Sequence, residues 1–151
     1  MPTVKVKKLD HFTDDLKLPA YETSSAAGAD IRACLGKGEK REIAPGERLA
    51  VPTGLSFEIP EGFEIQVRPR SGLSLKSPLM VVNSPGTVDA DYRGEVKVLI
   101  GNLGNESYTI EHGDRIAQLV FVPVVQAQYV VTQKLSETER GEGGFGSTGR
   151  K

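Results

Sequence analysis

Phe63-Glu64-Ile65-Gln66-Val67-Arg68 is a stretch in which apolar and polar side chains alternate. Successive side chains of a β-strand point to opposite faces, so this period of two predicts a strand with one apolar and one polar face. The same alternation occurs in Val4-Lys5-Val6 and in Glu95-Val96-Lys97-Val98. The pattern indicates antiparallel strands that leave one face in solvent.

Turn-forming residues separate the predicted strands. The chain has 17 glycines and nine prolines in 151 residues, and turns such as Pro60-Glu61-Gly62 and His112-Gly113-Asp114 lie between short apolar runs. The segment from Ser71 to Ser77 can form at most one or two helical turns, because Gly72 and Pro78 bracket it. An all-β fold, either a sandwich or a barrel, is therefore predicted.

Composition limits the classes of partner. The net charge is -1, and no run of Lys or Arg is longer than Lys7-Lys8, which argues against binding to long nucleic acids. The most apolar stretch, residues 116–131, is interrupted by Gln118 and Pro123, so we expect neither export nor a membrane span. The single cysteine, Cys34, excludes an intramolecular disulfide and fits a reducing compartment. We expect a cytoplasmic protein.

The C-terminal residues differ in composition from the rest. From Ser136 onward the chain is rich in Gly, Ser, Thr and Glu, and Phe145 is the single aromatic residue of this segment. We therefore expect a β domain at residues 1–135 and a flexible arm at 136–151. Its glycines resemble those of phosphate-binding loops, and Phe145 could stack on a nucleobase. The simpler interpretation is a terminus without a ligand.

Two further segments carry charged or hydroxyl groups in turns. In Arg68-Pro69-Arg70-Ser71-Gly72-Leu73 an arginine and a serine open a tight turn that could bind an anion, although a solvated arginine and a capping serine would look the same. The segment 83–94 carries Asp89 and Asp91, which an i, i+2 spacing places on one side of a strand. Either carboxylate could act as a base, or both could be ordinary turn residues.

Five motifs in a fixed order favour a functional role for these segments over ordinary turns. The chain contains AGADI at 27–31, RPRSGLS at 68–74, NSPGTVDADYRG at 83–94, GDRIAQ at 113–118 and RGEGGFGSTG at 140–149. Together they resemble the motifs of the trimeric dUTPase family, over a span from about residue 18 to residue 150. The resemblance implies a distorted, jelly-roll-like β-barrel of the β-clip type and a homotrimer. It also implies that each active site takes motifs from three chains.

The resemblance further implies an activity. A dUTPase hydrolyses dUTP to dUMP and pyrophosphate with Mg²⁺, by attack of water on the α-phosphorus, which keeps uracil out of DNA and supplies dUMP for thymidylate synthesis. Asp89 matches the general base, and Asp30 and Gln118 match residues that hold Mg²⁺ through water. Tyr92 matches the tyrosine that lies under the deoxyribose and excludes a ribose.

The remaining binding roles also come from the resemblance. The residues that match uracil readers are Asn83, Thr87, Val88 and Lys97. The residues that match contacts to the phosphates are Arg70, Ser71, Gly72, Arg140, Gly146, Ser147 and Thr148. Phe145 matches the aromatic residue that stacks on uracil.

Other interpretations remain open at this stage. A dCTP deaminase shares the scaffold but needs a further carboxylate near the base, and it would release ammonia. A non-catalytic nucleotide-binding protein would bind dUTP without turnover. A structural module without a ligand would require every motif to be turn chemistry.

Overall fold

The computed structural model describes residues 2–145. These residues contain 12 strands and one short helix. The strands are β1 (Lys5–Lys8), β2 (Ala20–Tyr21), β3 (Gly28–Arg32), β4 (Lys40–Ile43), β5 (Arg48–Pro52), β6 (Leu55–Glu58), β7 (Phe63–Arg68), β8 (Leu79–Val81), β9 (Gly86–Val88), β10 (Lys97–Asn102), β11 (Tyr108–Glu111) and β12 (Arg115–Pro123). The helix, α1 (Ser71–Lys76), has six residues and lies in the connection between β7 and β8.

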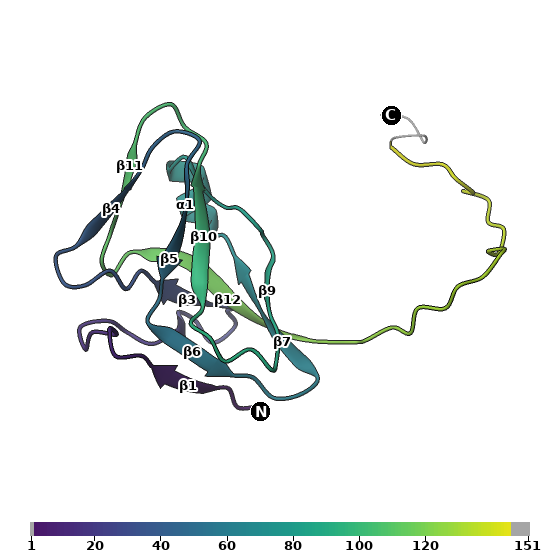
Figure 1. Ribbon diagram of the computed structural model, residues 1–151, viewed down its shortest axis with the longest axis horizontal. Coiled ribbons are helices and arrows are strands. Elements are labelled where there is room, and N and C mark those ends of the chain that lie inside the picture. The colour runs from purple at the N-terminus through teal and green to yellow at the C-terminus, as the bar shows by residue number, and fades with distance from the viewer. Residues whose placement is uncertain (1, 146–151) are drawn as a thin grey trace.

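The strands form four antiparallel sheets (Figure 1). The largest has the order β2-β3-β12-β7-β9, and a three-stranded sheet has the order β5-β10-β8. Two pairs, β1-β6 and β11-β4, complete the body. The predicted all-β, jelly-roll-like fold is confirmed, although the described strands do not close into a single barrel.

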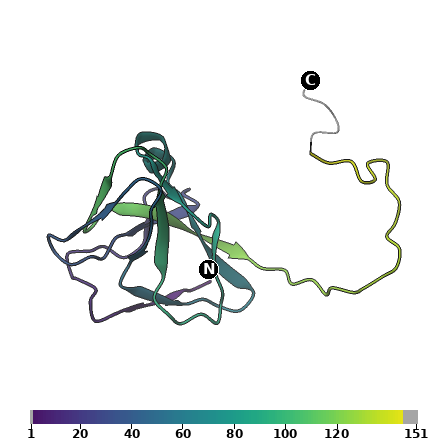
Figure 2. The same cartoon turned by 45° about the horizontal axis from the view of Figure 1, so that its top comes forward.

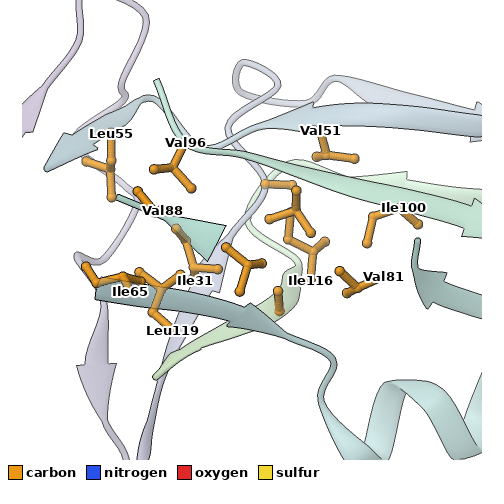
Figure 3. Packing of buried hydrophobic residues seen from close by; sticks show 14 of the residues in the cluster. Ile31, Val51, Leu55, Ile65, Val81, Val88, Val96, Ile100, Ile116 and Leu119 are labelled. Atoms are coloured by element: carbon orange, nitrogen blue, oxygen red, sulfur yellow. The ribbon is translucent and has the colours of Figure 1, made fainter. Parts of the chain in front are cut away.

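The hydrophobic core lies between the two larger sheets (Figure 3). Ile31 and Ile65 from the five-stranded sheet are at most 4% exposed, and Val51 and Ile100 from the three-stranded sheet are fully buried. Burying a side chain of this size stabilises the fold by about 1.5–3 kcal/mol. Because side chains alternate along β3, the inward Ile31 leaves its neighbour Asp30 on the opposite face of the sheet.

Predicted and observed strands agree best at β7, which has the predicted bounds Phe63–Arg68. The alternation at 95–98 is not strand throughout, since β10 begins at Lys97. Glu95 and Val96 leave the ladder because the Val96 amide donates to the Leu55 carbonyl at 2.9 Å. The short helix confirms the prediction of one or two turns.

The chain after β12 runs away from the body (Figure 2). The Val124 amide still donates to the Gly62 carbonyl at 2.8 Å, but within the described range 2–145 the hydrogen bonds of residues 125–145 are all to one another. Val125 and Tyr129 are more than 90% exposed. The predicted arm boundary at residue 136 stays a prediction. Among the described residues, no helix has the length and apolar character needed to cross a bilayer.

Candidate active site

A surface hollow of about 460 Å³ lies between β9, β10 and the loop that joins them. Six of the residues predicted to bind substrate line it: Asn83, Thr87, Val88, Asp89, Tyr92 and Lys97. The fold brings them together because β9 and β10 flank the hollow while the 89–96 loop curves around it. The segment 83–94 therefore contributes much of the lining of this hollow.

The edge strand β9 gives this hollow free backbone groups. β9 is the last strand of the five-stranded sheet and pairs only with β7, with Thr87 opposite Gln66. Alternate N–H and C=O groups of an edge strand point away from its partner. Asn83 lies against Gly86, whose hypothetical Cβ would be 2.9 Å from Asn83 Nδ2. These groups can read the hydrogen-bonding edge of a planar base.

Tyr92 also lines the hollow and is held by two hydrogen bonds. Its hydroxyl donates to the Glu95 carbonyl at 3.0 Å, and its amide donates to the Asp89 carbonyl at 3.1 Å. A Cβ at Gly94 would lie 2.4 Å from the tyrosine oxygen, so only glycine lets the ring fold back. The ring remains half exposed and presents an apolar surface.

Asp89 is exposed and lines the hollow. Within residues 2–145 its carboxylate accepts no hydrogen bond and forms no ion pair, since only the Asp89 backbone carbonyl is bonded. A free carboxylate can accept a proton from a bound water. The Asp89 carboxylate is therefore available to a ligand in the hollow.

A second cluster, the Asp30 cluster, consists of Asp30, Arg70, Arg115 and Gln118. Arg70 Nε donates to Asp30 Oδ1 at 2.8 Å, and Arg115 Nη1 donates to Asp30 Oδ2 at 3.0 Å. Asp30 stands opposite Gln118 in the β3-β12 ladder, and Gln118 Nε2 donates to the Pro69 carbonyl at 2.8 Å. The three motifs AGADI, RPRSGLS and GDRIAQ therefore meet in one place.

The start of α1 adds polar groups beside this cluster. Arg70 is the N-cap residue and Ser71 the first helical residue, and the cap has no side-chain hydrogen bond. Amides in a first helical turn lack intrahelical partners. A Cβ at Gly72 would meet no atom within 4 Å. The space around Gly72 is thus open to an anion.

The predicted site residues fall into three separate groups in one chain. Neither a hydrogen bond nor an ion pair between described residues joins the hollow to the Asp30 cluster. In the arm, Arg140 Nε donates to the Gly143 carbonyl at 2.7 Å and Phe145 is fully exposed. Gly146, Ser147 and Thr148 lie outside the described residues. In a single chain, therefore, the hollow, the Asp30 cluster and the arm do not form one site.

Two residues with evident roles were missed from the sequence. Arg115 lies within the GDRIAQ motif but had no predicted role, although it orients Asp30. Glu95 lines the hollow and also had none. The first could have been inferred from its place in a motif, whereas the second depends on contacts with residues more than 40 positions away.

Comparison with known proteins decides the family. The dUTPase family model matches residues 14–149. The chain belongs to the dUTPase family. This confirms the family predicted from the five motifs and, with it, a dUTP-hydrolysing enzyme.

Curated relatives of this dUTPase match nearly its full length. The deoxyuridine 5'-triphosphate nucleotidohydrolase of Bdellovibrio bacteriovorus is 58% identical over 147 residues, which cover 97% of this chain and 96% of the relative. The enzyme of the same name from Brucella melitensis is 53% identical over 148 residues, covering 98% and 94%.

Solved dUTPase structures share the fold. A mutant dUTPase of Staphylococcus bacteriophage 80alpha with dUpNHpp has a TM-score of 0.84 and 30% identity, covering 97% of this chain and 98% of that one. A mutant dUTPase from phage phi11 of S. aureus, described with a structural Mg(II) ion, has a TM-score of 0.75 and 25% identity, with coverages of 87% and 97%.

Proposed function

We propose that this chain hydrolyses dUTP to dUMP and pyrophosphate in a site that several copies of the chain complete. One observation carries the proposal: the free carboxylate of Asp89 belongs to a hollow that is also lined by the edge strand β9 and by Tyr92. A planar base and a sugar fill such a hollow, and the carboxylate then faces the phosphate chain.

The hollow suits uracil. Uracil presents an N–H between two carbonyls, which pairs with the backbone groups of Thr87 and Val88 and with the Asn83 amide. Cytosine reverses part of this pattern and would leave buried polar groups unpaired, which costs about 1–3 kcal/mol for each group. Tyr92 packs under the sugar and leaves no room for a 2′-hydroxyl.

The hydrolysis step uses Asp89. Its carboxylate takes a proton from a water whose oxygen attacks the α-phosphorus, and the bond from that phosphorus to the bridging oxygen breaks as pyrophosphate leaves. Arg70, with Ser71 and the open backbone at Gly72, holds the phosphates in line. Arg140, Phe145, Gly146, Ser147 and Thr148 close over the nucleotide.

The Asp30 cluster fits a magnesium ion held mainly by the substrate. The described residues contain no group of three acidic, histidine or cysteine side chains that could bind a metal alone. Each carboxylate oxygen of Asp30 accepts one bond from an arginine and keeps a second lone pair. The bond of Gln118 to the Pro69 carbonyl uses Nε2, which leaves Oε1 able to accept another bond. These oxygens can hold water ligands of Mg²⁺, which keeps several waters when it binds phosphates. Bound there, the ion neutralises phosphate charge.

A homotrimer supplies the contacts that one chain lacks. The apolar run Leu119–Val125 predicts a segment covered on both faces, yet Val125, beyond the end of β12, is 94% exposed in the single chain. A second copy is the simplest cover, and the separation of the three groups calls for further chains. Cytoplasmic location remains a prediction from the sequence.

Product analysis tests the proposal. The purified protein, with Mg²⁺, is given dUTP, dCTP, dTTP or UTP, and pyrophosphate, monophosphate and ammonia are measured. We expect pyrophosphate and dUMP from dUTP alone. Ammonia from dCTP would favour the deaminase, and dUTP binding without any product would favour a non-catalytic binder; either result would contradict the proposal.

A further inference from the structure

Glu95 is a largely buried carboxylate in the wall of the nucleotide hollow, and the proposed hydrolysis gives it no role. Its side chain is 14% exposed. Its Oε1 accepts a hydrogen bond from the Gly54 amide at 2.8 Å and lies 2.8 Å from His11 Nε2. Its Oε2 lies 3.8 Å from Lys97 Nζ. A carboxylate with this many partners is held in one orientation.

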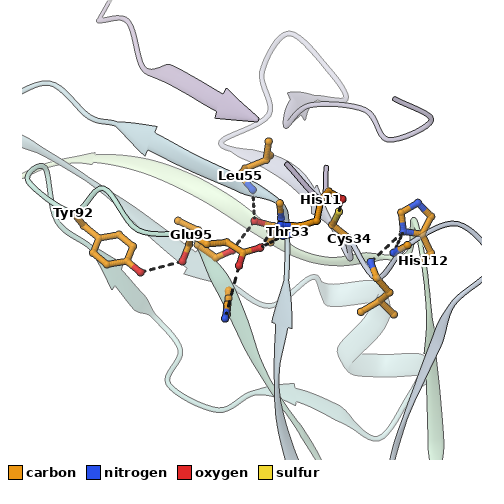
Figure 4. Close-up of polar contacts among 12 residues, drawn as sticks. His11, Cys34, Thr53, Leu55, Tyr92, Glu95 and His112 are labelled. Atoms are coloured by element: carbon orange, nitrogen blue, oxygen red, sulfur yellow. Dashed lines mark hydrogen bonds and ion pairs between the residues drawn. The ribbon is translucent and has the colours of Figure 1, made fainter. Parts of the chain in front are cut away.

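Hydrogen bonds join Glu95 and Val96 to the segment 53–55 (Figure 4). Gly54 has a φ of +68°, and a Cβ there would lie 2.9 Å from Cys34 Sγ, so a residue with a side chain would strain this turn. On each side of Gly54 the loop is bonded to Val96: the buried Thr53 hydroxyl donates to the Val96 carbonyl, and the Leu55 carbonyl accepts from the Val96 amide. Glu95 is therefore anchored through its side chain and through the next peptide.

The same residue holds Tyr92. The Tyr92 hydroxyl donates to the backbone carbonyl of Glu95 at 3.0 Å (Figure 4). Tyr92 is 46% exposed, so packing alone does not fix its ring. Exclusion of one hydroxyl group requires that the Tyr92 ring keep its position beside the sugar. The bond from its hydroxyl to the anchored Glu95 peptide holds the ring there.

We propose that Glu95 is a positioning residue for sugar discrimination. It fixes the Tyr92 ring against the deoxyribose, and through His11 it ties the N-terminal segment to the nucleotide hollow. This inference rests on the proposed function, in which Tyr92 faces the sugar. The contacts of Glu95 are to Gly54, His11, Lys97 and Tyr92, and the proposed hydrolysis uses none of these side-chain contacts, so its effect is on which sugar is accepted.

The test compares kcat/KM for dUTP and for UTP in Glu95→Ala and Glu95→Gln. The alanine variant removes the anchor, and we expect the dUTP to UTP ratio to fall about tenfold, mainly because UTP is hydrolysed better. The glutamine variant keeps an oxygen that accepts from Gly54, and we expect its ratio to stay within about twofold of the wild type. His11→Ala should lie between them.

Two controls make the result decisive. Glu58→Ala removes an exposed carboxylate paired with Lys5 on the neighbouring strand, and its ratio should not change. Tyr92→Phe keeps the ring and removes only its bond to Glu95; because this side chain is half exposed, the variant should fold, and its ratio should also fall. Equal losses for both substrates in Glu95→Ala, or an unchanged ratio in Tyr92→Phe, would overturn the inference. A wild type inactive on dUTP would instead refute the proposed function.

Discussion

Arg70 Nε donates to Asp30 Oδ1 at 2.8 Å, and this bond joins two motifs that lie 40 residues apart in the chain. In the proposed mechanism Asp30 faces the hydrated magnesium ion and Arg70 faces the phosphates. A single ion pair therefore sets the distance between the two groups that manage substrate charge. Arg115 completes the arrangement from the opposite side of the carboxylate.

Loss of Arg115 should weaken catalysis without unfolding the protein. Arg115→Ala leaves one oxygen of Asp30 without its arginine, so the carboxylate gains rotational freedom. We expect kcat/KM for dUTP to fall about tenfold, the size typical for residues that orient metal-binding groups. Steady-state kinetics at several Mg²⁺ concentrations measures this. Arg41→Ala, an exposed arginine on β4, serves as the control, and equal activity of the two variants would contradict the role given to Arg115.

Removal of the proposed base should separate binding from hydrolysis. Asp89→Asn keeps the shape of the hollow but cannot accept the proton, so kcat should fall by about 100-fold or more. Calorimetric titration with a non-hydrolysable dUTP analogue should show binding close to that of the wild type. Asp91→Asn, two residues away and equally exposed, should remain active. Comparable losses in both variants would show that Asp89 is not the base.

Two glycines should respond differently to alanine. Nothing lies within 4 Å of a Cβ at Gly72, and alanine favours a helix over glycine by about 1 kcal/mol, so Gly72→Ala should not lower the free energy of unfolding. We expect it to lower activity, because the phosphates need the space. At Gly28 a Cβ would lie 2.2 Å from Gln118 Oε1, so Gly28→Ala should displace that amide and cost about 1 kcal/mol. Urea unfolding and kinetics measure both; a destabilised but fully active Gly72→Ala would contradict this account.

The thiol of Cys34 should react slowly in the folded protein. Burial raises the pKa of this thiol, which is 2% exposed and donates to the His11 carbonyl at 3.2 Å. A raised pKa lowers the thiolate fraction at any given pH, so reactivity should increase only as the pH rises through the folded-state pKa. At pH 8 we expect reaction with a disulfide reagent about 100-fold slower than in urea. Similar rates in the two states would show that the thiol is accessible.

Patterns along the chain predicted a strand where all residues of that strand lie in one sheet. The alternation in 63–68 identified β7, whose two ladder neighbours lie within one sheet. Pro78 lies just beyond the end of the helix, whereas Gly72, which was expected to bracket the helical turns, is the second residue of α1. At Glu95 and Val96 the same alternation failed, since the Val96 amide donates to the carbonyl of Leu55, 41 residues earlier, and β10 begins only at Lys97. Patterns along the chain carry no information about such a contact.

The site was predictable as a set of motifs but not as an arrangement. Asp89 and Tyr92 came from one segment, and the fold places them together in the hollow. Asp30 and Gln118 belong to distant segments, and only the pairing of β3 with β12 makes them neighbours. The sequence also did not reveal that Arg115 orients Asp30, because this depends on side-chain direction across the sheet.

Complementation between two inactive variants tests the central claim that copies of the chain share each site. Asp89→Asn retains the arm but lacks the base, and a chain that ends at residue 135 retains the base but lacks the arm. Each is purified alone, and the two are then unfolded and refolded together. If the arm serves a site on another chain, hydrolysis of dUTP should return in the mixture, because some sites combine an intact Asp89 with an intact arm. A mixture as inactive as its separate components, with mixed oligomers present, would contradict the account.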